Sequence, residues 1–452
     1  MGAPAGALES RQLSRCTQRM PRLRDPELIG RLREAWPVAV LLGAFGIVTV
    51  TFTQGVLTQT GRFPTLLVSL IAMSGWLALA VAIACLTLVG RARFSSLALL
   101  VAAAMALPTA ALVIYRWHTG IPLAVNDGMF QTEIVTGNLL AGHDPYGTDF
   151  THTELLRWFS YVPANSSVPY HYEYYPLVVL VSVPVALVER LFHLGIDLRP
   201  LVLLGCAIAF GLITKLPWSW RWRYALAVLL FLDPFFGFIE GRSDILWLVP
   251  MLAAVLFALD GRWTAASWAI GVAAAFKLFA FPFAFFMAAV LWFRWRRGEV
   301  GGRAVLLAAL GLVAPLLLTS IPFLIWNAGA FWGDTLGQFL ETPARFPMYG
   351  IGLGEALLIT HVVADPMAPF PFAAVQAVLA IPLVVLGLRT LSGRPSLANL
   401  LGASTTILAV IVLFGRVTNT NYVTALFFLY GLSIATARHE RARESAARPK
   451  AA

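Results

Sequence analysis

Residues 123–146 read LAVNDGMFQTEIVTGNLLAGHDPY and place polar and acidic side chains directly after an apolar segment. Elsewhere the chain is mostly apolar: 59% of its 452 residues are hydrophobic, 12% are charged, and the mean hydropathy is +0.76. A soluble fold would not bury that much apolar surface, and uncharged runs long enough to cross a bilayer recur along the chain. We therefore predict an all-α polytopic membrane protein. A carboxylate beside a span, here Asp127, is a candidate functional group in such a protein.

Hydropathy predicts about twelve or thirteen membrane-spanning helices. The candidate spans are 36–56, 65–89, 95–115, 175–188, 200–214, 224–238, 245–259, 265–292, 304–326, 369–388, 396–414 and 422–437. The run 265–292 is too long for one span, contains Lys277 and Pro282, and is flanked by arginines on both sides. We interpret it as two short, re-entrant helices that meet near Lys277 toward the outer surface, where non-helical backbone has to be buried in protein. The basic segment 215–223 also predicts that one of the spans 175–188 and 200–214 does not cross fully.

The net charge of +10 reflects topology rather than nucleic-acid binding. Basic residues gather in both tails and in the segments 91–93, 294–303 and 389–394, which is the positive-inside pattern. We expect cytoplasmic basic tails at 1–35 and 438–452, one membrane domain at 36–437, and outer loops at 117–174 and 327–368. The tail leads into a full-length span without a secretory signal, so we expect a multi-pass protein of the plasma membrane. Three cysteines provide neither a disulfide framework nor a metal knuckle.

The first outer loop begins with a predicted helix. The segment 126–140, NDGMFQTEIVTGNLL, favours a short amphipathic helix at the membrane interface, capped by Asn126 or Asp127 and ending before Gly142. Glu133 is expected on roughly the same side of this helix as Asp127. The following HDPY motif predicts a turn, because a proline disfavours the helical region for the residue before it, here Asp144.

Several short motifs around this loop occur in a characteristic order. They are Asp127-Gly-Met-Phe130, then LLAGHDPY at 139–146, then YEYYP at 172–176, which opens the next span. This arrangement resembles the first outer loop of polyprenol-phosphate-sugar-dependent glycosyltransferases of the GT-C fold. It is most similar to the branch with the phosphatidylinositol-mannoside mannosyltransferases and the catalytic subunit of glycosylphosphatidylinositol mannosyltransferase I.

Two further motifs extend the resemblance to residues 127–282. The turn GRSD at 241–244 resembles the family's Gly-Arg-x-x-Asp turn, with the aspartate one position early, and AFKLFAFP at 275–282 resembles its Lys-and-Pro hairpin. Two features depart from the family. The first acidic position is Asn126-Asp127 rather than a paired Asp-x-Asp, so a divalent metal is not favoured, and two spans precede the family's usual first helix.

The resemblance implies an inverting glycosyltransferase that moves a sugar, with mannose favoured, from a polyprenyl-phosphate-sugar donor to a glycolipid or cell-envelope glycan on the outer face. It implies no cofactor and gives Asp127 the role of the base that accepts the proton of the acceptor hydroxyl. Cationic groups that would stabilise the leaving phosphate are Lys277, Arg416 and Arg242. Lys277 is the only charged residue between Trp263 and Phe293, so its burial calls for a compensating anion. Further substrate contacts are expected from Glu133, Tyr146, His171, Glu173, Tyr174, Asp244 and Asn421.

Ordinary structural roles compete with these functional ones. Lys277 can snorkel to the interface, Arg242 and Asp244 can form a solvated turn or a salt bridge, and tyrosines can form an interfacial belt. The loop histidines match no metal-binding spacing. The competing class of protein is a secondary transporter or lipid flippase, since broken helices also suit transport, and a membrane scaffold without activity is a third. The large acidic outer loop and the lack of an evident inverted repeat favour the enzyme.

Overall fold

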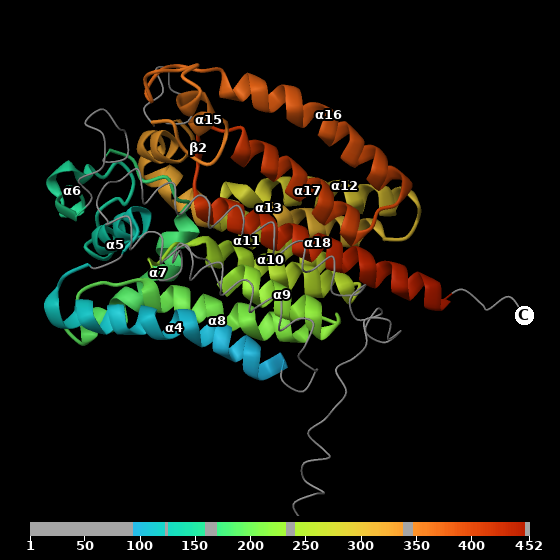
Figure 1. Ribbon diagram of the computed structural model, residues 1–452, viewed down its shortest axis with the longest axis horizontal. Coiled ribbons are helices and arrows are strands. Elements are labelled where there is room, and N and C mark those ends of the chain that lie inside the picture. Colours follow the sequence, from blue (N-terminus) through green and yellow to red (C-terminus); the bar gives the residue numbers. More distant parts are fainter. Residues whose placement is uncertain (1–93, 123–124, 159–169, 232–239, 338–346, 448–452) are drawn as a thin grey trace, which may run out of the picture.

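The computed structural model describes residues 94–122, 125–158, 170–231, 240–337 and 347–447, which form a bundle of helices with a cluster of short elements at one end (Figure 1). The helices are α4 (Phe94–Thr119), α5 (Asp127–Leu140), α6 (Leu155–Trp158), α7 (Pro176–Leu191), α8 (Arg199–Lys215), α9 (Trp220–Phe231), α10 (Asp244–Leu259), α11 (Trp263–Phe276), α12 (Phe281–Arg296), α13 (Gly302–Trp332), α15 (Leu353–Ile359), α16 (Phe372–Gly393), α17 (Leu397–Leu413) and α18 (Thr420–Ala447). Single turns of other helix types are η2 (Phe150–His152), η4 (Leu278–Ala280) and η5 (Gly333–Gly337).

Four stretches of helix in the described part of the chain are long and apolar enough to cross a membrane: Leu278–Arg296, Gly302–Gly337, Phe372–Gly393 and Thr420–Ala447. Shorter apolar helices accompany them at Asp244–Leu259, Trp263–Phe276 and Leu397–Leu413. The protein is therefore helical and has the composition of a membrane-embedded chain, as predicted. The spans expected at 36–56 and 65–89, and the tail at 1–35, lie outside the described residues, and the full number of crossings stays a prediction.

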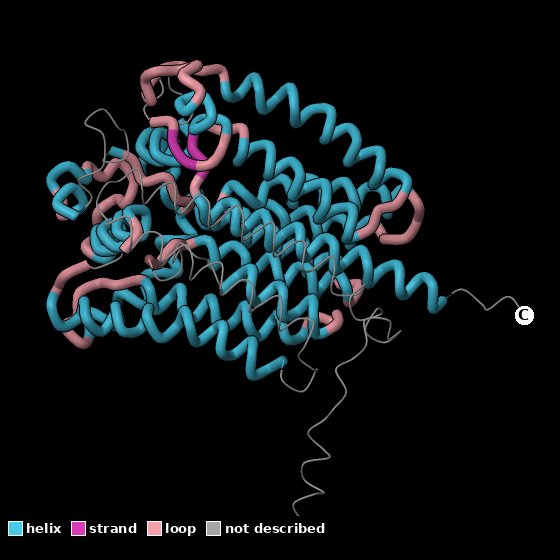
Figure 2. The backbone as a smooth tube through the Cα atoms, viewed as in Figure 1, coloured by secondary structure: helices cyan, strands magenta, loops and turns pink. Residues whose placement is uncertain are grey.

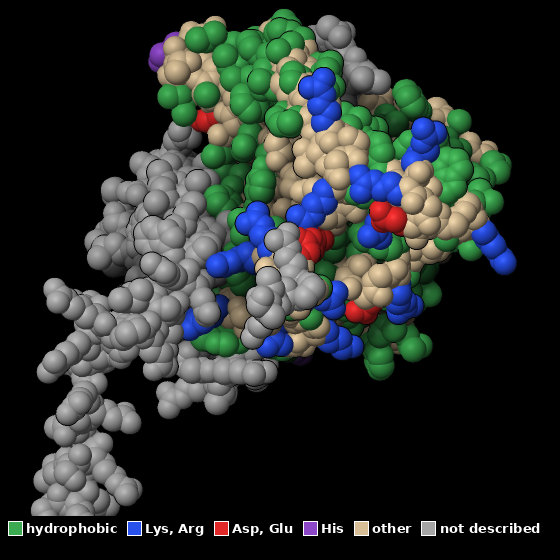
Figure 3. Space-filling view, turned by 90° about the vertical axis from the view of Figure 1, so that its right-hand side faces the viewer, with side chains coloured by type: hydrophobic (Ala, Val, Ile, Leu, Met, Phe, Trp, Pro, Cys, Tyr) green, Lys and Arg blue, Asp and Glu red, His purple; other side chains and the backbone are tan. Residues whose placement is uncertain are grey.

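The helices give the bundle two distinct ends. At the first, which we call the site end, α11 ends and α10 and α18 begin. The contacts of Asp244 with Lys277 and Asn421 show that these three helix ends lie together. At the second, which we call the basic end, α10 and α18 end and α17 begins. The hydrogen bond from the Leu397 N–H to the Glu440 carboxylate shows that the start of α17 lies beside the end of α18. Lys and Arg side chains gather on the face at this second end (Figure 3). That distribution follows the positive-inside pattern.

Helix α7 lies at the site end. Its first turn follows Tyr175, which lines the cavity described below, and near its last turn Glu189 accepts hydrogen bonds from the Asp197 N–H and from Trp117 at the end of α4. Both ends of α7 are thus at the same end of the bundle. Helix α8 then carries the chain to the basic segment 215–223. Of the two predicted spans 175–188 and 200–214, the first is the one that does not run the length of the bundle.

The predicted break within 265–292 is confirmed. Helix α11 ends at Phe276, Lys277 is in an extended conformation, and α12 begins at Phe281. Helix α11 also lies very close to α13, since a Cβ added to Gly271 would be 2.0 Å from the carbonyl oxygen of Gly311. Small residues allow such close approach of membrane helices. This contact holds α11 firmly and so helps to position Lys277.

The predicted all-α class is confirmed: the described part of the chain is helical apart from two short parallel strands, β1 (Tyr349–Gly350) and β2 (Val417–Thr418), drawn in magenta in Figure 2. Two other sequence predictions need correction. Helix α5 exists and is capped by the Asn126 side chain, but most of its residues from Gly128 to Thr136 are buried, so it is not a surface amphipathic helix. The second outer loop was expected from residue 327, whereas α13 continues to Trp332 after a kink at Asn327.

Candidate active site

A cavity of about 980 Å³ opens at the site end of the bundle. The first outer loop, the 240–244 turn, the break at Lys277 and the start of α18 supply its polar wall, and α12, α16 and α17 supply its apolar wall. All of the predicted site residues line it except Glu133 and Tyr146: Asp127, His171, Glu173, Tyr174, Arg242, Asp244, Lys277, Arg416 and Asn421. Segments more than two hundred residues apart in the sequence, such as Asp127 and Arg416, therefore share one cavity.

Asp244 is the centre of the polar wall and is 3% exposed. Its Oδ1 accepts hydrogen bonds from Lys277 Nζ at 2.7 Å and from Trp247 Nε1 at 3.1 Å, and its Oδ2 accepts from Asn421 Nδ2. These contacts join α10, the α11–α12 break and α18. A charge-assisted network of this kind keeps the three helix ends in a fixed relation.

Lys277 is held inside the protein. Besides the ion pair with Asp244, its ammonium lies 4.7 Å from the ring centre of Phe279 and 4.8 Å from that of Tyr422. A snorkelling side chain would point to water, so this geometry excludes the snorkelling interpretation. The compensating anion expected for the buried charge is Asp244, and it belongs to the protein.

The two predicted arginines lie on the cavity wall but are already hydrogen-bonded. Arg242 donates from Nε to Glu240 and from Nη1 to Asn421 Oδ1 at 3.0 Å, rather than pairing with Asp244. Arg416 donates to the carbonyl oxygens of Ala368 and Pro366, at 3.0 and 2.7 Å. Since β2 begins directly after Arg416, the pairing of β1 with β2 sets its position beside the cavity.

Two carboxylates, Asp127 and Glu173, line the cavity without an ion-pair partner among the described residues. Asp127 starts α5, and its Oδ1 accepts a hydrogen bond from the Gly128 N–H at 2.8 Å. Gly128 packs closely here, because an added Cβ would be 2.1 Å from the Tyr174 hydroxyl and the tyrosine ring would have to shift. The N-cap residue Asn126 also accepts from the Gly128 N–H, at 3.1 Å, so the start of α5 keeps a side-chain cap without Asp127.

Burial raises the pKa of the Glu173 carboxyl above its usual value; Lys277 opposes this effect, and the charges of Asp127 and Asp244 add to it. In the folded protein Glu173 therefore holds its proton to higher pH than in the unfolded chain. Such a group stabilises the fold below its unfolded pKa and loses that contribution as the pH rises through its folded pKa.

We therefore expect Glu173→Gln to unfold at a temperature higher by about 2 °C or more at about pH 8. The difference from the wild type is expected to vanish near about pH 4, where both side chains are neutral. Unfolding of the purified protein in detergent, followed by tryptophan fluorescence across this pH range, measures it. Equal unfolding temperatures throughout would contradict the argument.

His171, just before α7, connects the first loop to η5 at the end of α13. Its Nδ1 donates to Asp334 Oδ1 at 2.9 Å, and the Gly147 N–H donates to Asp334 Oδ2 at 2.7 Å. The other ring nitrogen, Nε2, is buried and has no hydrogen-bond partner in the described part of the chain. The imidazole is thus held by Asp334, and His171 is one of the residues that line the cavity.

The structure places two predicted contact residues elsewhere. Glu133 is buried beneath the loop, where both of its oxygens accept from Arg116, at 2.9 and 2.7 Å, and one also accepts from the Leu198 N–H. Burial raises the pKa of Glu133 to about 7, which Arg116 opposes. Tyr146 is 3% exposed, donates to the Tyr174 carbonyl, and packs edge-on against Phe331. Both side chains support the loop rather than line the cavity.

Sequence reasoning missed several lining residues: Gln131, Trp332, Tyr349 and Tyr422. No motif marked them, although Tyr422 directly follows the predicted Asn421. Within the described ranges, no group of three or more His, Cys, Asp or Glu side chains is placed to hold a metal ion.

Comparison with protein-family models gave no match to this sequence, and comparisons with curated proteins and with solved structures gave none either. Any assignment of function therefore depends on the geometry of the cavity and on the motif resemblance.

Proposed function

We propose that this protein is an inverting GT-C-type glycosyltransferase. It transfers a sugar, with mannose favoured, from a polyprenyl-phosphate-sugar donor to a glycolipid or cell-envelope glycan on the outer face of the membrane. The observation that carries the proposal is the composition of the cavity, which combines two carboxylates that have no ion-pair partner in the described part of the chain, three cations and several aromatic rings with a long apolar wall.

An amphiphilic ligand matches that composition. The apolar wall is formed by side chains of α12, α16 and α17: Phe281, Phe285, Phe286, Val384, Ile407, Leu408, Ile411 and Val412. Its helix α16 is among the candidate membrane spans and is largely exposed on its outer surface. A prenyl chain entering from the bilayer would contact this wall, and its phosphate and sugar would then reach the polar wall.

The carboxylates supply the chemistry of the attack. In the proposed reaction Asp127 takes the proton of the acceptor hydroxyl as its oxygen forms a bond to the anomeric carbon. The bond from that carbon to the phosphate oxygen breaks on the opposite side, which inverts the configuration and releases the lipid phosphate. Glu173 and His171 lie on the same wall and would hydrogen-bond the sugar or the acceptor.

The cations supply the stabilisation of the leaving group. Lys277 has three N–H donors, of which one is directed at Asp244, so it retains hydrogens for a phosphate oxygen. Arg242 and Arg416 are fixed by Asn421 and by backbone carbonyls, and a positioned guanidinium loses little entropy when it binds an anion. Positive charge that is already positioned where negative charge develops in the transition state lowers the activation barrier effectively.

The position of the cavity favours the enzyme over a transporter. Its polar residues come from the starts of α5, α10 and α18 and the end of α11, at one end of the bundle. Secondary transporters bind their substrates near the middle of the bilayer, between structural repeats.

Sugar transfer is tested with the purified protein in detergent and a radiolabelled polyprenyl-phosphate-mannose donor. We expect release of free polyprenyl phosphate that depends on added membrane-lipid extract as the source of acceptor. Donor that stays intact with every extract and every sugar tested, while lipid crosses the membrane of reconstituted vesicles, would instead identify a flippase.

A further inference from the structure

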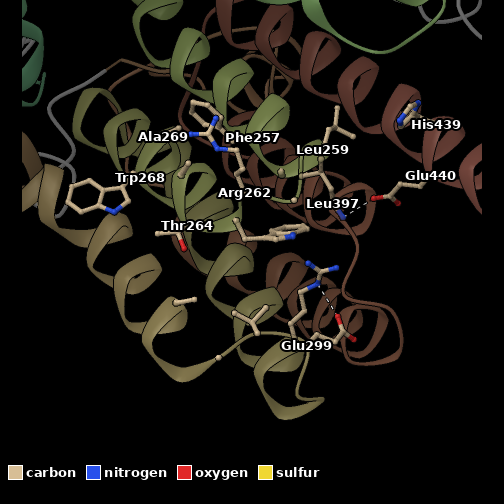
Figure 4. A pocket seen from close by; sticks show the side chains of 18 of the residues that line it. Phe257, Leu259, Arg262, Thr264, Trp268, Ala269, Glu299, Leu397, His439 and Glu440 are labelled. Carbon is tan, nitrogen blue, oxygen red and sulfur yellow. Dashed lines mark hydrogen bonds and ion pairs between the residues drawn. The ribbon is translucent and has the colours of Figure 1, made fainter.

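A second cavity, of about 1220 Å³, lies at the basic end of the bundle, opposite the candidate active site. It is bounded by the α10–α11 and α12–α13 connections, the start of α17 and the last turns of α18. Helix α10 separates the two cavities: its sixteen residues correspond to about 24 Å. Figure 4 shows Arg262, Trp268, Glu299 and His439 around this cavity.

The acidic side chains of this cavity are already bound. Glu299 pairs with Arg294 at 3.3 Å and with Arg297 at 3.9 Å. Glu440 accepts hydrogen bonds from the N–H groups of Leu397 and Ala398 at the start of α17. Glu299 is therefore already paired with arginines, and Glu440 is directed at the start of α17 and forms no ion pair with Arg262 or Arg443 among the described residues.

Two arginines of the cavity remain uncompensated. The Arg262 guanidinium stacks 4.8 Å from the ring centre of Phe257, and Arg443 donates one long hydrogen bond, 3.4 Å, to the Leu259 carbonyl. Neither forms an ion pair with a described residue. Both guanidinium groups belong to the lining of the same cavity, which favours an anion as its occupant.

The other walls are apolar and aromatic, with Trp263, Trp268 and Val272 among the lining residues. Trp268 is 41% exposed, and Trp292 and Trp295 are exposed nearby on α12. Exposed tryptophans at the ends of apolar helices mark the headgroup level of a bilayer. The cavity thus lies where phosphate groups of membrane lipids are found, and arginines next to membrane spans bind anionic headgroups.

We propose that this cavity binds the phosphate headgroup of an anionic phospholipid, with Arg262 and Arg443 as its main anion contacts. The headgroup phosphate accepts hydrogen bonds from the two guanidinium groups, and the glycerol and upper acyl chains contact Trp263 and Trp268. This site is separate from the proposed sugar transfer and does not depend on it.

Binding is measured on the full-length protein purified in a non-ionic detergent. Native mass spectrometry gives dissociation constants for dioleoyl-phosphatidylglycerol and dioleoyl-phosphatidylcholine, and calorimetry gives that for inorganic phosphate. We expect phosphatidylglycerol to bind most tightly and the double variant Arg262→Gln/Arg443→Gln to bind it about tenfold more weakly. The control Arg303→Gln/Arg389→Gln removes the same charge from exposed positions outside the cavity and should bind as the wild type does.

Each other outcome overturns the proposal. Equal binding of phosphatidylcholine would show that the site does not select a net negative charge. Equal binding of inorganic phosphate would show that the lipid part of the ligand contributes nothing to binding. Equal losses of phosphatidylglycerol affinity in the two double variants would show only a general effect of charge. If no tight phosphatidylglycerol adduct forms, the cavity is not a binding site for this lipid. Unfolding temperatures of both variants, recorded without lipid, ensure that folded proteins are compared.

Discussion

Asp127→Asn is expected to lower the rate of sugar transfer by roughly a hundredfold or more while leaving the protein folded. The asparagine has nearly the same size and keeps an acceptor oxygen for the Gly128 N–H, and the Asn126 cap of α5 is untouched. A loss of stability above about 1 kcal/mol is therefore not expected. The measurement is the initial rate of polyprenyl phosphate release at saturating donor, together with the unfolding temperature.

Asp149→Asn is the matched control. Asp149 is in the same outer loop, does not line the cavity, and caps η2 by accepting from the Thr151 N–H, which asparagine also does. Glu133→Gln is unsuitable, because it weakens the buried pair with Arg116. If Asp127→Asn keeps its activity and Glu173→Gln loses it, the base is Glu173, and the glycosyltransferase proposal survives with a changed residue.

Lys277→Met is expected to lower donor use at least tenfold and also to destabilise the protein by roughly 3–5 kcal/mol. The destabilisation arises because Asp244, with only neutral donors left from Trp247 and Asn421, stays buried as a charge. Stability alone thus does not reveal whether Lys277 binds phosphate.

The double variant Lys277→Met/Asp244→Asn separates the two roles. Removing both charges leaves no unpaired ion, so much of the lost stability should return. A phosphate-binding Lys277 predicts that the Michaelis constant for the donor stays high in this folded variant. Recovery of donor use together with stability would reduce Lys277 to a structural partner of Asp244.

The sequence predicted elements that depend on local chemistry. The cap at Asn126, the turn at Asp144, whose Oδ1 accepts from the Tyr146 N–H, and the helix break at Lys277 all follow from the residues at those positions. Nine of the eleven predicted site residues also line the cavity, since polar groups next to apolar spans are few and gather where spans end.

Features that depend on distant partners were not predictable in this way. Glu133 was expected to share a side of α5 with Asp127, but its neighbour Arg116 is on another helix, and nothing in the loop sequence signals that pairing. The same holds for the partner of Lys277: the need for an anion was apparent, whereas its identity as Asp244 required the arrangement of α10 against α11. The β1–β2 pairing joins two-residue strands, too short to give an alternating pattern.

The network of Asp244, Lys277 and Asn421 also has a consequence for biosynthesis. Asn421 belongs to α18, the last of the described helices, so a chain emerging from the ribosome contains every earlier described part of the cavity before this contact can form. Until α18 inserts, the Asp244–Lys277 pair lacks the amide that fills its second oxygen, and the cavity lacks the ring of Tyr422. The polar wall of the cavity is therefore completed only after α18 has been synthesised and inserted, and a chain that ends before Asn421 would lack this contact.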